Sequence, residues 1–281
     1  MIDPLADLLI DPVVRAALAE DLGRAGDITS LACVDPEARL KVQFAVRQTG
    51  VIAGLDCARL SMAAMDPSIR FSAQRRDGDR VEAGEALAQA EGNARAILAA
   101  ERTALNLMGR LSGVATLTSH YVDAVSGTRA KIVDTRKTTP GLRALEKYAV
   151  RCGGGVNHRF GLDDAILIKD NHVAAAGGVG KALERARATA GHLVQVEVEI
   201  DSLDQLDEAL AHAPDVVMLD NFSLQDLAEA VRRTAGRVRL EASGGVSLNT
   251  VRAIAETGVD VISVGALTHS APVLDIGLDT L

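Results

Sequence analysis

Residues 216–265 read VVMLDNFSLQDLAEAVRRTAGRVRLEASGGVSLNTVRAIAETGVDVISVG. Three short apolar runs, VVMLDN, VRLEASGG and VDVISVG, are separated in this stretch by Ala-rich amphipathic segments. Such alternation is typical of βα units, in which helices cover a parallel sheet or close around a barrel. We therefore assign the chain to the α/β class.

The same pattern continues toward the N-terminus of the stretch. Three more runs, KIVDTR (131–136), AILIKD (165–170) and VQVEVEI (194–200), recur at comparable intervals. Almost every run ends in a polar residue or a glycine. In α/β barrels the active site lies at the C-terminal ends of the strands, so we expect these side chains to converge at one mouth.

The first part of the chain follows a different pattern. A helix is expected in the first two dozen residues, strands and turns over 39–50 and 71–92, and a helix over 94–111. We therefore expect an N-terminal domain over residues 1–112 and a barrel domain over 113–281, with the tail 267–281 packing back on the first domain.

Composition excludes several classes of protein. The net charge is -8, which gives no support to a nucleic-acid partner. No apolar run approaches the ~20 residues of a membrane span. The N-terminal residues lack the basic start of a secretory signal, so we expect a cytoplasmic protein that does not act on membranes.

One region is basic within this acidic chain. Between Arg129 and Lys169 there are nine Lys or Arg and four Asp or Glu residues. Arg136 and Lys137 follow one expected strand, and Lys169 follows the next. His158 and Arg159 come after a triple glycine, which allows close approach of the backbone to a ligand. Because an Arg fork binds carboxylates through paired hydrogen bonds, the pattern favours an anion site.

Two glycine turns predict a phosphate site. The turn Ser243-Gly244-Gly245 precedes a segment, 248–256, that we expect to be helical, and backbone N–H groups at a helix N-terminus bind anions. The second turn, Val264-Gly265-Ala266, follows the last expected strand. In barrels, phosphate is often held by the loops after the final two strands.

Two acids follow successive expected strands. Glu199 and Asp220 could hold Mg²⁺ or ribose hydroxyls, lie under a developing positive charge, or simply cap the next helix.

Longer motifs resemble the quinolinate phosphoribosyltransferase family. The resemblance covers the whole chain and rests on GDITS (26–30), ERTALNLMGRLSG (101–113), DTRKTTPGLR (134–143), EKYAV (146–150), GGGVNHRFGLDDAILIKDNH (153–172), EVE (197–199), MLDN (218–221), EASGGV (241–246) and GVDVISVGALTHSAPVLDI (258–276).

The resemblance implies an N-terminal α/β sandwich domain, an incomplete (open) TIM-like α/β barrel, and a homodimer with shared active sites. Its implied activity is transfer of phosphoribosyl from phosphoribosyl pyrophosphate (PRPP) to quinolinate with loss of CO2, a step of NAD biosynthesis. Mg²⁺ is the implied cofactor, held directly or indirectly by Glu199 and Asp220, and no organic cofactor is needed.

The resemblance also assigns residues. Arg102 would reach the substrate of the neighbouring subunit. A basic pocket would consist of Thr135, Arg136, Lys137, His158, Arg159 and Lys169. Lys137, Glu199 and Asp220 would be catalytic, and the two glycine turns with His269 would hold the 5'-phosphate.

Two alternatives remain open from the sequence. A related phosphoribosyltransferase could act on a different base, as nicotinate phosphoribosyltransferase or the molybdenum-associated paralogue does. A noncatalytic metabolite-binding barrel could keep the same fold. The many basic residues favour a dicarboxylate substrate over a different base. The presence of Lys137, Glu199 and Asp220 argues against a noncatalytic protein.

Overall fold

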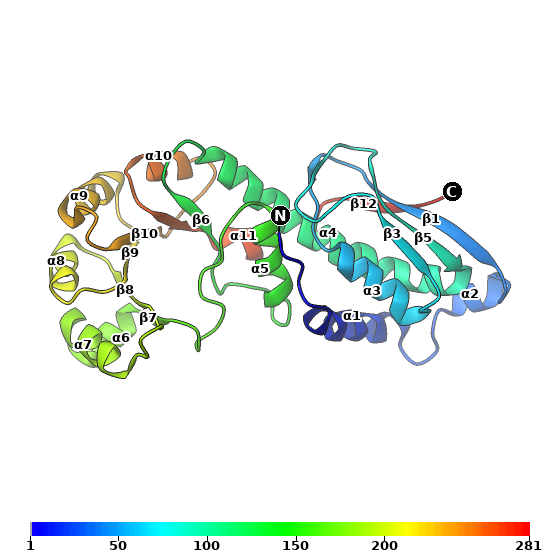
Figure 1. Cartoon of the computed structure of the whole chain (residues 1–281), viewed down its shortest axis with the longest axis horizontal. Helices are drawn as coiled ribbons and strands as arrows, with labels where there is room; N and C mark the ends of the chain where they lie inside the picture. The colour runs from blue at the N-terminus through cyan, green and yellow to red at the C-terminus, as the bar shows by residue number, and fades with distance from the viewer. Residues whose placement is uncertain (1) are drawn as a thin grey trace. The chain divides into compact units, whose positions relative to one another are not determined.

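The computed structural model describes residues 2–281, which divide into two compact α/β units. The first unit contains the chain up to Ser119, Thr138–Gly154 and Leu267–Leu281. The second contains His120–Lys137 and Gly155–Ala266. The boundary expected between residues 112 and 113 falls inside one long helix, α4 (Ala94–Ala124), drawn in green in Figure 1.

The first unit is built on a four-stranded sheet of order β12-β1-β5-β3, with antiparallel neighbours. Its strands are β1 (Arg39–Val46), β3 (Arg70–Ala73), β5 (Ala86–Asn93) and β12 (Ile276–Thr280), and β2 (Gly50–Val51) pairs separately with β4 (Arg80–Val81). Its helices besides α4 are α1 (Asp7–Leu22), α2 (Ile28–Cys33), α3 (Leu55–Met65) and α5 (Arg143–Cys152).

These elements confirm the N-terminal helix and the strands expected over 39–50 and 71–92. The helix expected over 94–111 is present but runs 13 residues further, to Ala124. Gly113 does not end it, because the glycine serves close packing instead. A Cβ at this position would lie 1.9 Å from the carbonyl oxygen of Pro272.

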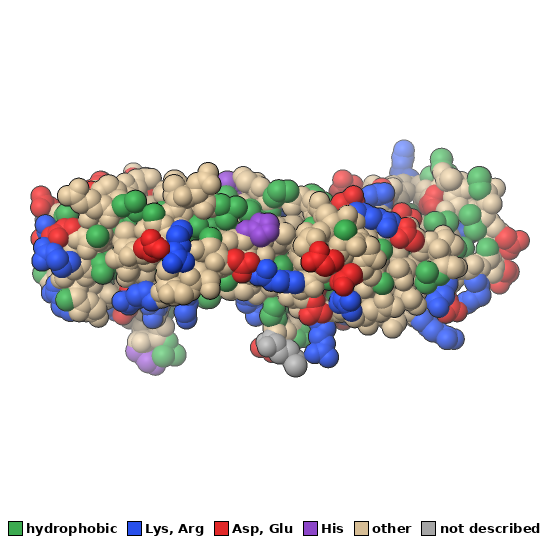
Figure 2. Space-filling view, turned by 90° about the horizontal axis from the view of Figure 1, so that it is seen from above, with side chains coloured by type: hydrophobic (Ala, Val, Ile, Leu, Met, Phe, Trp, Pro, Cys, Tyr) green, Lys and Arg blue, Asp and Glu red, His purple; other side chains and the backbone are tan. Residues whose placement is uncertain are grey.

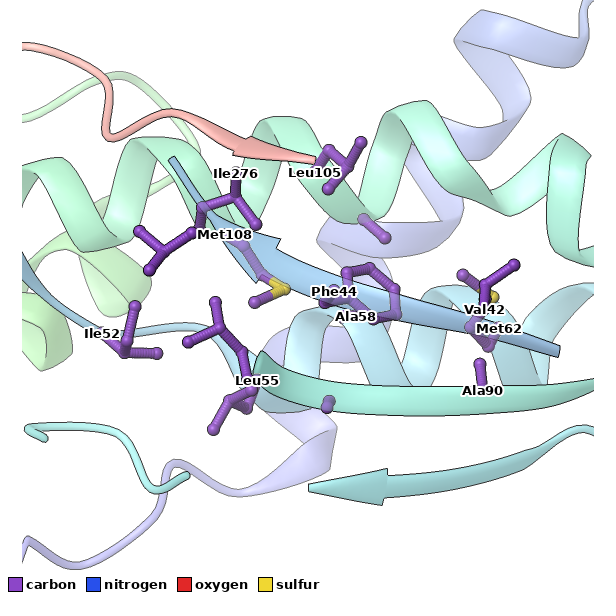
Figure 3. Close-up of a cluster of buried hydrophobic side chains, with 14 of the residues drawn as sticks. Val42, Phe44, Ile52, Leu55, Ala58, Met62, Ala90, Leu105, Met108 and Ile276 are labelled. Carbon is purple, nitrogen blue, oxygen red and sulfur yellow. The ribbon is translucent and has the colours of Figure 1, made fainter. Parts of the chain in front are cut away.

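The core of the first unit lies between its sheet and its helices. Phe44 and Val42 on β1 pack with Met62 on α3 and Met108 on α4, and Ile276 on β12 joins them (Figure 3). The C-terminal tail therefore belongs to this unit by packing as well as by strand pairing.

Replacing Phe44 with alanine is expected to destabilise the first unit by about 3–5 kcal/mol, because the fully buried ring leaves a cavity. Urea unfolding followed by circular dichroism measures the change. Leu8→Ala is the matched control, since Leu8 is 82% exposed and its loss should cost within about 0.5 kcal/mol. If Phe44→Ala and Leu8→Ala unfold at the same urea concentration, this account of the core is wrong.

The second unit contains one parallel sheet of order β6-β11-β10-β9-β8-β7. The six strands expected from the sequence are all present: β6 (Lys131–Val133), β7 (Ile166–Ile168), β8 (Val196–Ile200), β9 (Val216–Asp220), β10 (Arg239–Ser243) and β11 (Val261–Ser263). Strands β7 to β11 are neighbours in chain order, which is the order of a barrel. Between its edge strands, the described residues show only an isolated parallel bridge from Val133 to Val156, so the barrel is open.

Helices follow the strands of this unit (Figure 1). They are α6 (Asp170–Ala176), α7 (Val179–Thr189), α8 (Leu203–Ala211), α9 (Leu224–Thr234), α10 (Val251–Glu256) and α11 (Ala266–His269), the last of which crosses into the first unit. The start of α9 shows how the sequence sets a boundary. Ser223 caps it, with its hydroxyl oxygen accepting a hydrogen bond from the Asp226 N–H at 3.1 Å.

Lys and Arg side chains are interspersed with Asp and Glu on the face drawn in Figure 2. Across residues 2–281, no helix combines the length and apolar character that crossing a membrane requires.

Candidate active site at the open barrel

The inner face of the parallel sheet gathers the predicted acids and the first glycine turn. Strand register places Asp220 beside Ser243, and places Glu199 beside Met218, two residues before Asp220. Side chains at alternate positions share one face of a sheet, so Glu199, Asp220 and Ser243 project from the same face. The sequence prediction that successive strand ends converge is thus met for these three residues.

Two arginines of the predicted basic pocket lie close together without anionic partners at Nε. The Nε atoms of Arg136 and Arg159 are buried and have no hydrogen-bond partner. Burial, together with repulsion from Arg136, lowers the pKa of Arg159. Buried N–H groups of guanidinium ions are costly to leave unpaired. An anion placed between them would satisfy both groups.

The two lysines of the predicted basic pocket, Lys137 and Lys169, have other surroundings than the two arginines. Lys169 forms an ion pair with Glu199 and is the residue preceding helix α6. The backbone N–H of Lys137 donates to the Thr135 hydroxyl at 3.0 Å, which turns the chain directly after β6. Lys137 itself is exposed. These positions leave charged side chains at the ends of β6 and β7.

His158 is held from its backbone and from its ring. Its N–H donates to Asp134 Oδ1 at 2.9 Å, and the neighbouring Asn157 amide donates to Asp134 Oδ2 at 2.6 Å. Its Nε2 lies 3.0 Å from Glu197 Oε2 and 3.7 Å from Glu241 Oε2. The ring is therefore directed toward two buried carboxyl groups.

The first glycine turn has a tight geometry. Gly244 and Gly245 have φ of 91° and 61°, values that L side chains rarely adopt. A Cβ on Gly244 would lie 2.1 Å from the Asn221 side-chain oxygen. The turn therefore requires glycine and brings the chain after β10 against the end of β9.

The expectation of a helix beginning at residue 248 is wrong. Helix α10 begins at Val251, so the glycine turn does not lie at a helix N-terminus. A turn over Ser247 to Thr250 intervenes, in which the Thr250 hydroxyl accepts from the Ser247 N–H at 2.9 Å. Such side-chain to backbone bonds compete with helix formation. The N–H groups that this turn presents are therefore those of the loop itself, and its phosphate role stays a prediction.

The other predicted phosphate residues are divided between the units. Val264, Gly265 and Ala266 follow β11 in the second unit, where the Val264 N–H donates to the Val133 carbonyl at 2.9 Å. His269 belongs to the first unit and its Nδ1 lies 2.6 Å from the Ser270 hydroxyl. Its phosphate role stays a prediction.

Arg102 also belongs to the first unit. It is exposed on α4, and Leu98 and Asn106, one turn away on either side, are exposed as well. These three residues form an exposed stripe along α4. That Arg102 reaches into a neighbouring subunit stays a prediction.

The sequence placed Asp134 and Glu197 among the polar strand ends expected at the mouth but gave them no role, and it did not single out Glu241. Glu197 and Glu241 are 8% and 3% exposed, and Asp134 is fully buried. The alternation of Glu197 with Glu199, and of Glu241 with Ser243, was a signal that each pair shares one face of its strand. Of the described residues, His158, Glu197 and Glu241 form a group whose potential ligand atoms all lie within 4.8 Å of one another.

Comparisons with known proteins agree with this architecture. The family model for the N-terminal domain of quinolinate phosphoribosyl transferase matches residues 27–112, and the model for its C-terminal domain matches residues 114–279. A nicotinate-nucleotide pyrophosphorylase [carboxylating] of Mycobacterium leprae is 51% identical over 271 residues, covering 95% of each chain.

Other relatives extend the comparison. A probable nicotinate-nucleotide pyrophosphorylase [carboxylating] of Bacillus subtilis is 45% identical, covering 92% of this chain and 89% of its own. The structure of the nicotinate-nucleotide pyrophosphorylase from Francisella tularensis superposes with a TM-score of 0.95 at 42% identity, covering 100% of this chain and 99% of that one. With both domain models matched and relatives of this similarity along nearly its full length, the chain belongs to the quinolinate phosphoribosyl transferase family.

Proposed function

We propose that this protein transfers the phosphoribosyl group of PRPP to quinolinate and releases CO2 and pyrophosphate, leaving nicotinate mononucleotide. The observation that carries the proposal is the pair of half-buried guanidinium groups, Arg136 and Arg159, whose Nε atoms have no partner. Two such groups at close range favour a ligand with two negative charges. Quinolinate, a pyridine with two adjacent carboxylates, has that charge. Family membership supports the same substrate.

The basic pocket would bind and orient the dicarboxylate. With Arg136, Arg159 and His158 holding the carboxylates, the ring nitrogen would face C1 of the ribose. The loops after β10 and β11 would hold the 5'-phosphate through backbone N–H groups. Holding two reactants in this alignment replaces an encounter in solution with a local step.

The reaction would form the bond between the pyridine nitrogen and ribose C1 as the bond from C1 to pyrophosphate breaks. Positive charge develops on the sugar, and the carboxylates of Glu199 and Asp220 would stabilise it. Lys137 would neutralise charge on the leaving pyrophosphate. Once the ring nitrogen is quaternised, the C–C bond to the adjacent carboxylate breaks and CO2 departs. The electron pair stays on the ring carbon next to the nitrogen, and that carbon takes up a proton from solvent to give nicotinate mononucleotide.

Glu199 and Asp220 are also the residues that would hold Mg²⁺. Their oxygen atoms match the preference of this ion, which usually takes one or two carboxylates together with substrate phosphates. When bound, Mg²⁺ would supply charge neutralisation on the pyrophosphate. Glu199 already pairs with Lys169, so the lysine would compete with the ion for this carboxylate.

We further propose a homodimer in the cytoplasm, with Arg102 of one subunit entering the site of the other. Its exposure on α4 and the family membership of the chain support this arrangement.

A CO2-release assay tests the proposal. Quinolinate labelled at the carboxylate next to the ring nitrogen is expected to release label only when PRPP and Mg²⁺ are both present. Nicotinate, which lacks that carboxylate, should give less than about 1% of the quinolinate rate because one guanidinium group is left without its partner. Faster turnover of nicotinate would identify the protein as a transferase for a different base, and absence of pyrophosphate release with either base would make it a binding protein.

A further inference from the structure

We infer that Glu197 and Glu241 are positioning residues that hold the His158 ring in one orientation and in its cationic form. The inference rests on the proposed function, in which His158 belongs to the pocket for the dicarboxylate. Neither glutamate was placed in that pocket from the sequence.

The geometry comes from two strands that are not neighbours. Glu197 lies on β8 and Glu241 on β10, with β9 between them, and the register places both beside residues of the inner face of β9. His158 Nε2 lies 3.0 Å from the first carboxylate and 3.7 Å from the second. The ring therefore bridges the gap across β9.

Burial makes this arrangement electrostatically strong. Charged groups are screened little when they are removed from water, and a carboxylate nearby favours the imidazolium form of histidine. Glu197 Oε1 and Glu241 Oε1 are buried without hydrogen-bond partners, and a cationic ring would offset part of the charge of both carboxyl groups. Burial, and then repulsion by Glu197, raise the pKa of Glu241 to about 7.

The charged neighbours of the ring are mostly acidic, and Arg159 is the exception. Asp134, which follows β6, holds the His158 backbone and repels Glu241. Arg159 in the same loop interacts favourably with Glu197, while Ser263 on β11 interacts with Glu241. Several acidic groups thus surround one imidazole, and the protonated ring is the form that they favour.

The alternative interpretation is that His158, Glu197 and Glu241 bind a transition metal. The separation of 3.0 Å between Nε2 and Glu197 Oε2 fits a direct hydrogen bond from the ring, and it fits two ligands of one metal ion equally well. The acidic surroundings of the ring favour the ion pair, and a bound metal is an outcome of the experiment.

The first measurement is steady-state kinetics of Glu197→Gln and Glu241→Gln. The amides keep the shape of the side chains and remove the charge. The KM for quinolinate is expected to rise about tenfold in the first variant and about threefold in the second, with the KM for PRPP unchanged. The alkaline limb of kcat/KM for quinolinate should move to lower pH, by roughly one unit in Glu197→Gln, because the imidazolium loses its proton more readily.

A double-mutant cycle separates this role from a structural one. In a His158→Gln background the charge of the ring is already lost, so adding Glu197→Gln should change the KM for quinolinate by less than about twofold. Additive effects would overturn the inference. Glu241→Gln carries the same test if Glu197→Gln does not fold.

A spectroscopic readout is independent of catalysis. Nitrogen NMR of ¹⁵N-histidine protein, with the His158 signal identified from His158→Gln, should show the imidazolium persisting to higher pH in the wild type than in Glu197→Gln. The same titration in both proteins would overturn the inference, as would a transition metal bound at one equivalent and lost in Glu197→Gln. If the wild type releases CO2 but shows either of these results, the proposed function stands and the ion pair is wrong. If the wild type releases no CO2, the proposed function is wrong, and the NMR titration alone tests the ion pair.

Discussion

An Arg136→Ala variant is expected to lose on the order of 100- to 1,000-fold in kcat/KM for quinolinate, because one paired, charge-assisted contact to a carboxylate disappears. Of the two half-buried guanidinium groups, only Arg159 would then remain to bind the dicarboxylate. Most of the loss should appear in the KM for quinolinate, with the KM for PRPP changed little. The CO2-release assay over a range of both substrates gives these values.

Two control variants sharpen the result. Arg136→Lys keeps the charge and loses the planar fork, so it should recover only part of the activity. Arg232→Ala removes an arginine that pairs with Glu229 on the exposed surface of α9, and its kinetics should match the wild type. Near-native kcat/KM in Arg136→Ala would take Arg136 out of the site, and with it the observation on which the proposed function rests.

Mixing two inactive variants is expected to restore activity. Arg102→Ala alone should abolish turnover in both sites of a dimer, and so should Lys137→Ala. A mixed dimer would contain one site with Lys137 from one subunit and Arg102 from the other, and one site lacking both. Random reassociation should then give about a quarter of the wild-type activity, since half of the dimers are mixed and half of their sites are intact.

The readout is activity after joint unfolding and refolding, with native mass spectrometry to verify mixed dimers. Arg102→Ala mixed with Arg102→Ala,Lys137→Ala is the matched control and should stay inactive. Mixed dimers that form without activity would place Arg102 in its own subunit's site.

The sequence allowed the secondary structure of the second unit to be predicted closely. Each strand carried both an apolar run and a polar end, so strands such as β9 and β10 stood out from the segments around them. The predicted end of α4 and the predicted start of α10 were both wrong. Gly113 is explained by close packing against Pro272, which is distant in the sequence. The turn over Ser247 to Thr250 is explained by a side-chain hydrogen bond. The local sequence pattern reveals neither.

The site was predictable in its cations and only partly in its acids. Arg136, Arg159 and Lys169 were identifiable because charged residues next to glycines and strand ends have few structural uses. Glu197 was expected at the mouth without a role. Glu241 was not singled out, because a glutamate within an apolar strand resembles an ordinary half-exposed residue until the neighbouring strands are known.

The sequence by itself determined the α/β class, the order of strands and helices, and the gathering of basic residues at strand ends, because these follow from local periodicity and from residue types at strand ends. Only the tertiary structure decided that two buried glutamates, Glu197 and Glu241, flank His158. Their positions depend on which strands become neighbours. That choice is made by packing of the whole sheet, where residues far apart in the chain meet and water is excluded.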